Sequence, residues 1–239
     1  MLLLECGGKG YGKPGKMYYD KKTDFFASVC EYLGIPYGYY FLDEAITKEE
    51  VEEEVKFVTD YIKTHQGKFR VLPISIDMEY QHGNGRADLY WNERVELVNE
   101  LIEKMKNENL ECMLYANGAR IETYLKEVNC PYWTAMYPVD SKIPEKFYDE
   151  YMKEQMLINE EHPERVEESV LNTKVNKGGT DTLMYSEEYL KKVVAWQFTE
   201  DAASLDGIEG PLDLSLMDNE FFEKYYQKVF ETTEIWKGD

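Results

Sequence analysis

Short apolar runs alternate with stretches of helical periodicity along most of this 239-residue sequence. Leu2–Cys6 predicts a strand, Asp20–Leu33 an amphipathic helix and Ile35–Leu42 a second strand. The apolar residues of that helix fall on one stripe, expected to face the core: Phe25, Phe26, Val29, Tyr32 and Leu33. Strands that alternate with helices of this length form βαβ units, which build mainly parallel sheets. The alternation therefore predicts an α/β fold.

The same rhythm continues to the C-terminus. Thr47 and Glu50 form a capping box that opens a helix reaching about His65. Further helices are predicted over Trp91–Asn107, Ile121–Val128 and Asn219–Thr232, and further strands over Phe69–Asp77, Leu110–Ala116, Tyr132–Tyr137 and Val193–Thr199. No linker divides the chain, so residues 1–239 are expected to form one domain, with 139–188 as a helical insertion. The length suits an irregular (β/α) TIM-like barrel.

The strongly negative net charge of the chain argues against a nucleic-acid partner. The 47 acidic and 27 basic side chains give a formal net charge of −20, whereas nucleic-acid binding requires clustered Lys and Arg. No segment approaches the roughly 20 apolar residues that span a bilayer, so no membrane insertion is expected. The N-terminal residues carry no basic region and too short an apolar run for a signal peptide. The widely spaced cysteines are expected to be buried free thiols: Cys6, Cys30, Cys112 and Cys130.

The sharpest chemical signal is a pair of carboxylates, Asp77 and Glu79, that ends an apolar strand. A separation of two residues points both side chains to the same side of the sheet. They fall at the carboxyl end of a parallel strand, where α/β folds place their active sites. Two like charges this close should raise the pKa of at least one, which suits a general acid near neutral pH. The alternative is a strand end that merely caps the next loop.

Aromatic and polar side chains end other strands in a similar way. Trp133 and Tyr137 share one face, Trp196 and Gln197 reach a strand end, and Asp213 interrupts an apolar stretch. Aromatic rings beside carboxylates suit a sugar-binding cleft, because rings stack on pyranose faces. For each aromatic residue taken alone, a place in the core is the favoured interpretation.

Two weaker patterns point to other chemistry. The segment 10–15 matches the glycine spacing of a dinucleotide-binding loop, but Pro14 interrupts it and the next helix starts only near Asp20. A loop over the barrel mouth is the favoured interpretation, and a nicotinamide-dependent enzyme stays open as a rival. The three histidines have no ligand spacing, so no metal site and no cofactor are expected.

Taken together, five segments resemble glycoside hydrolase family 25, the N-acetylmuramidase lysozymes of bacteria and their phages. They occur in the family's order and are Gly34–Phe41, Ile76–Glu79, Trp133–Tyr137, Trp196–Thr199 and Gly207–Leu214. The resemblance implies an irregular (β/α) barrel with its cleft at the carboxyl ends of the strands.

The resemblance also implies roles for individual residues. Glu79 matches the acid that protonates the leaving glycosidic oxygen, and Asp77 matches its partner, which stabilises the transition state or the substrate's acetamido group. Asp213 matches a further cleft aspartate. The implied substrate-binding residues are Tyr40, Tyr115, Trp133, Tyr137, Trp196 and Gln197.

The implied activity is cleavage of β-1,4 bonds in peptidoglycan at N-acetylmuramic acid, by a retaining or substrate-assisted route. The implied location is outside the cell or at the cell wall. The matching segments start at the family's second strand, so an aspartate that the family carries on its first strand has no counterpart among them. A catalytically weak or inactive glycan-binding barrel is therefore the alternative.

Overall fold

The computed structural model describes residues 1–10, 15–79, 91–136, 146–147, 149–150, 186–202 and 212–232. Its strands are β1 (Leu2–Lys9), β2 (Met17–Tyr19), β3 (Tyr37–Leu42), β4 (Ile74–Asp77), β5 (Cys112–Asn117), β6 (Tyr132–Ala135), β7 (Val193–Ala202) and β8 (Leu212–Met217). Its helices are α1 (Thr23–Leu33), α2 (Lys48–Thr64), α3 (Trp91–Asn107), α4 (Gly118–Arg120), the π-helix η1 (Ile121–Leu125), α6 (Glu187–Lys192) and α7 (Asn219–Thr232). The segment 139–188, predicted as a helical insertion, lies for the most part outside the described residues.

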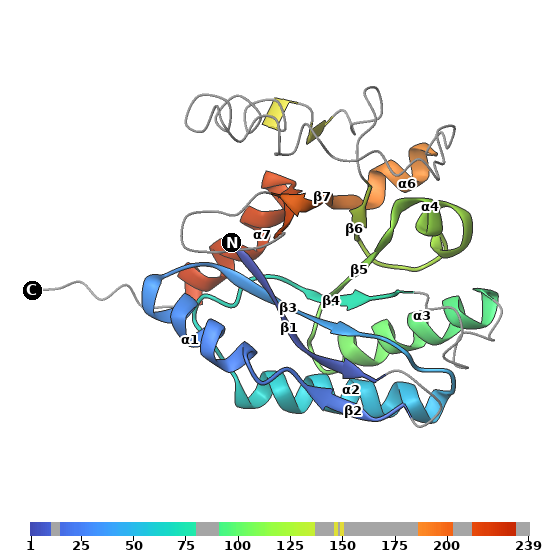
Figure 1. The fold of residues 1–239 in the computed structure, drawn as a ribbon, viewed down its shortest axis with the longest axis horizontal. Helices are drawn as coiled ribbons and strands as arrows, with labels where there is room; N and C mark the ends of the chain where they lie inside the picture. Colours follow the sequence, from blue (N-terminus) through green and yellow to red (C-terminus); the bar gives the residue numbers. More distant parts are fainter. Residues whose placement is uncertain are drawn as a thin grey trace, which may run out of the picture.

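The strands form one sheet in the order β2-β1-β3-β4-β5-β6-β7-β8. The six inner strands, β1 and β3 to β7, are parallel to one another. The two edge strands, β2 and β8, run antiparallel to their neighbours β1 and β7. The sheet curls into a half-barrel, and α1, α2 and α3 lie along the outside of its first strands (Figure 1). The predicted α/β fold, an irregular TIM-like barrel, is confirmed.

Local sequence explains why α2 and α3 form where they do. The Thr47 side chain accepts a hydrogen bond from the Glu50 backbone N–H, which satisfies one of the free donors of the first turn of α2. Apolar residues recur every three or four positions on each helix. The buried apolar residues of the two helices are Val51, Val55, Phe57, Val58, Tyr61, Ile62, Val95, Val98, Leu101 and Met105. These side chains fill the layer between the helices and the sheet.

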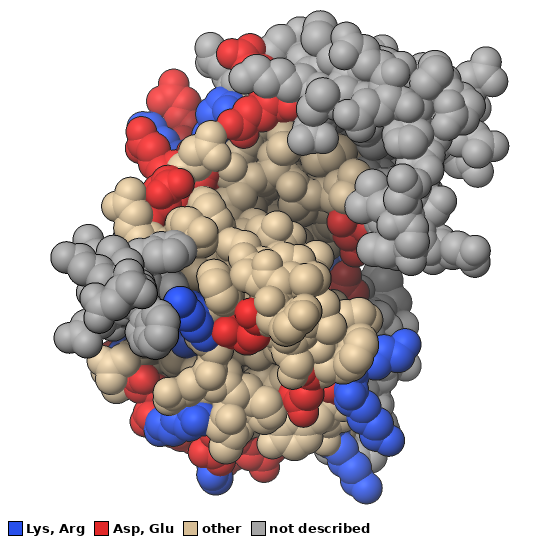
Figure 2. Space-filling model, turned by 90° about the vertical axis from the view of Figure 1, so that its left-hand side faces the viewer, with Lys and Arg blue, Asp and Glu red and all other residues tan. Residues whose placement is uncertain are grey.

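The helix α1 packs differently from the sequence prediction. Its buried residues are Thr23, Ala27 and Cys30, whereas Tyr32 is 88% exposed. Small side chains on the buried face let the helix lie close to β1, so the large apolar stripe points outward. The expectation that this stripe faces the core is therefore wrong. Figure 2 shows a broad area without charged side chains on the side of the molecule where α1 lies.

Three further elements depart from the sequence prediction. Regular strand pairing in β4 starts only at Ile74, because Pro73 has no N–H to donate, although Arg70 forms an isolated bridge with Tyr37. The predicted helix at Ile121–Val128 is a short π-helical turn that follows α4. The hairpin strand β2 was not predicted. No helix of the described ranges is long and apolar enough to cross a membrane.

Candidate active site

A cleft of about 590 Å³ opens at the carboxyl ends of the parallel strands and reaches β8. Seven of the residues that were predicted as site residues line it, and six of them lie on or next to the parallel strands: Tyr40, Asp77, Glu79, Tyr115, Trp133 and Gln197. Asp213 lines it as well, from the start of β8. Because β8 runs antiparallel to its neighbour, its start lies at the edge where the parallel strands end. The sheet thus gathers residues from both ends of the described chain, from Met1 to Ser215, into one cleft.

Asp77, the last residue of β4, is a buried carboxyl group, 9% exposed, and its Oδ1 has no hydrogen-bond partner among the described residues. Burial, followed by the negative charges of Glu79, Glu5 and Asp43, raises the pKa of Asp77 to about 8, although Arg120 acts in the opposite direction. The close spacing of the two carboxyl groups predicted a raised pKa for at least one of them, and the pKa of Asp77 is raised. Asp77 therefore holds a proton near neutral pH.

The backbone beyond Asp77 is fixed from two sides. The Met78 N–H donates to the Tyr115 carbonyl oxygen at 3.0 Å, and the Arg120 guanidinium donates to the Met78 carbonyl oxygen at 3.2 Å. Met78 is buried, so the alternation of the chain turns Glu79 outward, where its side chain is exposed in the cleft. The pair thus combines one buried carboxyl group with one that is open to solvent.

A second support holds the carbonyl end of β4. The Asp43 N–H donates to the Asp77 carbonyl oxygen at 2.9 Å. Arg94 donates to the carbonyl oxygens of Asp43 and Ala45 and forms an ion pair with the Asp43 carboxylate at 3.5 Å. Glu54 is fully buried beside Asp43, and burial together with the Asp43 charge raises the pKa of Glu54 well above its ordinary value. This buried network fixes the backbone on which Asp77 is carried.

The wall of the cleft beside Asp77 is aromatic, because Tyr115 is the register partner of Asp77 on the neighbouring strand. The rings of Tyr115 and Trp133, on neighbouring strands β5 and β6, lie 4.4 Å apart between centroids. The Tyr115 hydroxyl donates to Oε1 of Gln197, and the Trp133 indole N–H donates to the Ser215 hydroxyl at 3.1 Å. These bonds connect β5 to β7 and β6 to β8, and they orient both rings against the cleft.

Tyr40 lies on β3, the strand between β1 and the strand β4 that carries Asp77. Its side chain is half-buried and lines the cleft. Burial raises the pKa of Tyr40, and the nearby carboxylates Glu5, Asp77 and Asp213 raise it further. The phenol therefore keeps its proton at neutral pH and can donate a hydrogen bond to a ligand.

One predicted site residue, Trp196, is not brought to this cleft. Trp196 is fully buried with 0% exposure, donates its indole N–H to the Met136 carbonyl oxygen and packs against Phe198. Successive residues of a strand face opposite sides, so Gln197 points into the cleft while Trp196 points into the core. Tyr137 lies outside the described residues.

Two cleft residues with ionisable side chains were absent from the sequence prediction, namely Glu5 on β1 and Tyr18 on β2. The Tyr18 hydroxyl donates to Oε1 of Glu5 at 2.6 Å. A charged residue inside the otherwise apolar segment Leu2–Cys6 is a signal that could have identified Glu5, because such residues seldom lie in a strand without a polar neighbour.

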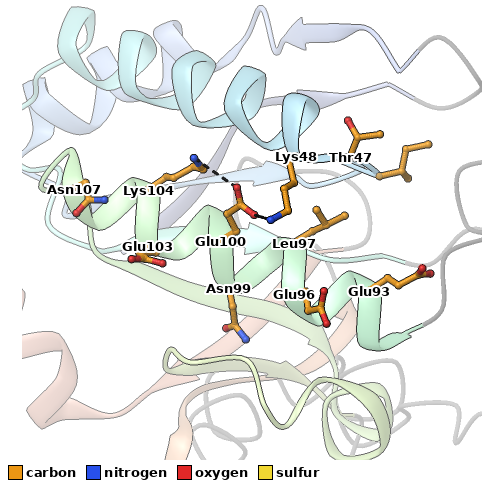
Figure 3. A pocket seen from close by; sticks show the side chains of 11 residues that line it. Thr47, Lys48, Glu93, Glu96, Leu97, Asn99, Glu100, Glu103, Lys104 and Asn107 are labelled. Atoms are coloured by element: carbon orange, nitrogen blue, oxygen red, sulfur yellow. Dashed lines mark ion pairs between the residues drawn. The ribbon is translucent and has the colours of Figure 1, made fainter.

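A second hollow, of about 810 Å³, lies between the start of α2 and the length of α3 (Figure 3). Its Lys and Glu side chains pair with one another: Lys48 with Glu100 at 3.1 Å, and Lys104 with Glu100 at 3.6 Å. It lies in the outer helical layer and contains none of the strand-end carboxylates. This second hollow is therefore a groove between helices, whereas the cleft at the strand ends contains the paired carboxyl groups Asp77 and Glu79.

Within the ranges that the structure describes, no group of three or more His, Cys, Asp or Glu side chains is arranged to hold a metal ion. The cleft contains the protonated carboxyl group of Asp77 and the further carboxyl groups of Glu79 and Asp213. Aromatic rings line the same cleft from the neighbouring strands β5 and β6. Paired carboxyl groups of this kind perform acid–base chemistry at glycosidic bonds. The class of protein that the fold and cleft define is thus a barrel-type α/β protein with a glycosidase-like cleft.

Comparison with solved structures narrows this class to one fold family. The sequence matches no protein-family model and no curated protein. The spore cortex-lytic enzyme SleM of Clostridium perfringens superposes with a TM-score of 0.63 at 20% identity over 91% of this chain. The catalytic domain of the endolysin Ply40 from Listeria phage P40 gives 0.58 at 16% identity over 94%. The glycosyl hydrolase 25 GHIP of Streptococcus pneumoniae gives 0.56 at 12% identity over 94%. The chain has a glycoside hydrolase family 25-like fold.

The matched proteins differ in length. The chain spans 59% of SleM and 39% of the modular autolysin LytC of Streptococcus pneumoniae, which gives a TM-score of 0.58 at 20% identity. It spans 84% of the Ply40 catalytic domain and 81% of GHIP.

Proposed function

We propose that this protein is a glycoside hydrolase that cleaves β-1,4 bonds of peptidoglycan at N-acetylmuramic acid. The observation that carries the proposal is the Asp77–Glu79 pair, with one buried and one exposed carboxyl group, at the end of β4 in a cleft of a family 25-like barrel. The fold places the cleft, and the carboxyl pair supplies the chemistry of glycosidic cleavage.

In this proposal Glu79 is the general acid, because its exposed side chain can reach the glycosidic oxygen in the cleft. It gives its proton to the leaving oxygen and then accepts a proton from the attacking water. Asp77, which lies deeper, acts on the sugar's acetamido group through a hydrogen bond in its protonated form, or on the developing positive charge in its ionised form. Asp213 is a further carboxylate facing the same sugar from β8.

The cleft walls bind the glycan in a defined position. The rings of Tyr115 and Trp133 offer a stacking surface for a pyranose ring, and the Gln197 amide offers hydrogen-bonding groups beside them. LytC has been solved in complex with a synthetic peptidoglycan ligand, which supports the same class of ligand for this chain. We infer that residues 1–239 form one catalytic domain and that it acts at the cell wall, outside the membrane.

The test is the substitution Glu79→Gln, which keeps the size of the side chain and removes the proton donor. Loss of a general acid lowers turnover by about 10²–10⁴-fold. Release of reducing ends from purified cell walls measures it, and urea unfolding verifies that the fold is intact. The control Glu52→Gln removes one exposed carboxylate from the outer surface of α2, where it pairs with Lys104, and should retain activity.

Unchanged turnover in the Glu79→Gln protein would refute the assignment of the acid. Binding of the wild-type protein to insoluble peptidoglycan without any release of reducing ends would identify a glycan-binding barrel instead of an enzyme.

A further inference from the structure

We propose that Glu5 is a further substrate-binding residue of the cleft, which selects at the β1 side for a sugar without an anionic substituent. The inference rests on the proposed function, because it assigns the ligand of the same cleft. It is drawn from the position of Glu5, from the hydrogen bond that orients it and from the oxygen atom that this bond leaves available.

Strand register places the Glu5 side chain on the cleft side of the sheet. Glu5 lies opposite Tyr40 on the neighbouring parallel strand, and Asp77 lies opposite Leu42, two positions further along that strand. Opposite residues and residues two apart project from the same face. Glu5 and Asp77 are thus two strands apart and offset by two residues along the strands, with about 12 Å between their backbones. This spacing places Glu5 beside the reacting carboxyl pair and not within it.

The backbone conformation after Glu5 places the Tyr18 hydroxyl group within hydrogen-bonding distance of the Glu5 carboxylate. The pairing of β1 with β3 shifts by one residue between Glu5 and Gly7, which is a β-bulge. Gly7 has a φ of +139°, and a Cβ at this position would meet the Tyr18 carbonyl oxygen at 2.0 Å, so only glycine fits. The close pairing of Gly7 with Tyr19 brings Tyr18 over the cleft, where its hydroxyl donates to Oε1 of Glu5 at 2.6 Å.

The second carboxylate oxygen of Glu5 is available to a ligand. Tyr18 occupies Oε1, and Thr23 donates only to the Glu5 backbone carbonyl, so no described residue donates to Oε2. The Glu5 side chain is half-buried and lines the cleft. A carboxylate accepts hydrogen bonds only, so the ligand must supply a hydroxyl or N–H donor.

The charge around Glu5 determines which sugar can lie there. The ionisable side chains that line the cleft besides Glu5 are the carboxyl groups of Asp77, Glu79 and Asp213 and the phenols Tyr18, Tyr40 and Tyr115. None of the described lining residues is Lys or Arg, and the α-amino group of Met1 is the one basic group among them. A lactyl carboxylate, as on a muramic acid, would be repelled at this position. A glucosamine-type ring fits, and its de-N-acetylated form adds a cationic amine that Glu5 attracts.

The experiment measures binding in the Glu79→Gln background, so that turnover does not consume the ligand. Isothermal titration calorimetry at pH 6 compares the neutral tetramer of N-acetylglucosamine with the cationic tetramer of glucosamine. The second substitutions are Glu5→Gln, which keeps the acceptor for Tyr18 but removes the charge, Tyr18→Phe, which releases the Glu5 carboxylate, and the control Glu52→Gln.

We expect Glu5→Gln to weaken binding of the neutral tetramer about tenfold, as for loss of a hydrogen bond to a charged group. Binding of the cationic tetramer should fall by more, so that the preference for it is reduced, an effect that a purely structural role of Glu5 would not produce. Tyr18→Phe should weaken both ligands by about threefold.

Equal affinities with and without Glu5→Gln, or an equal loss in the Glu52→Gln control, would overturn the proposal. So would a failure of the parent protein to bind either tetramer. Cell-wall turnover of the wild-type protein is measured separately: turnover with no effect of Glu5→Gln refutes only the inference about Glu5. Binding that depends on Glu5 without any turnover refutes only the hydrolase assignment.

Discussion

The buried carboxyl group of Asp77 makes the stability of this protein depend on pH in a predictable direction. In the folded chain the pKa of Asp77 is about 8, whereas an Asp in an unfolded chain has a pKa of about 3.9. The folded state therefore binds this proton more tightly than the unfolded state does. The contribution to stability is fully present below pH 4 and is lost as the pH rises towards 8.

The magnitude follows from the width of this window. Each pH unit between the two pKa values changes the free energy of unfolding by about 1.4 kcal/mol, so the change between pH 5 and pH 7 is about 3 kcal/mol. Asp77→Asn removes the titrating group and keeps the side-chain shape. Relative to the wild-type protein, the variant should become more stable by about 3 kcal/mol over this pH interval.

Urea unfolding at pH 5, 6, 7 and 8, followed by circular dichroism, measures the difference between the two proteins. The test is how the difference in the free energy of unfolding changes with pH. The amide group of the Asp77→Asn variant also alters local hydrogen bonding, but that contribution to the difference is the same at every pH. Glu52→Gln is the control for removal of one exposed carboxylate. A difference between wild type and Asp77→Asn that stays constant from pH 5 to pH 8 would refute the argument that burial holds a proton on Asp77.

Two further predictions concern the framework of the cleft. Gly7→Ala should destabilise the protein by about 2–4 kcal/mol, because the new Cβ meets the Tyr18 carbonyl oxygen at a positive φ; a fall in the urea midpoint measures this, and unaltered stability would contradict the strain. Thr47→Ala should cost about 1 kcal/mol through loss of the N-cap of α2, with Thr47→Ser as the variant that restores it; equal losses in both would argue against capping.

Much of the fold could be predicted because its elements depend on local pattern. The apolar periodicity of α3 gave its two ends, Trp91 and Asn107, and the Thr47–Glu50 capping box gave the start of α2. The pair Asp77 and Glu79 was identifiable because a strand of apolar residues ends abruptly in charge. Each of these signals lies within a few residues along the chain.

What could not be predicted depends on contacts between distant segments. The face of α1 that packs on β1 is chosen by the small residues Ala27 and Cys30, which the apolar pattern does not single out. Trp196 and Gln197 are neighbours in sequence, and only the register of β7 decides which one enters the cleft. Glu5 becomes a cleft residue because the hairpin to β2 brings Tyr18 over it.

The order of the strands in the sheet has a consequence for how the protein is made. Each parallel strand from β1 to β7 pairs with the next parallel strand in the sequence, so the sheet can grow strand by strand while the ribosome is still synthesising the chain. The cleft cannot form strand by strand in this way, because it contains both Glu5 from β1 and Asp213 from β8. A nascent chain that stops before β8 can hold a nearly complete sheet and still lack one wall of its cleft, so the cleft is complete only once β8 has been synthesised.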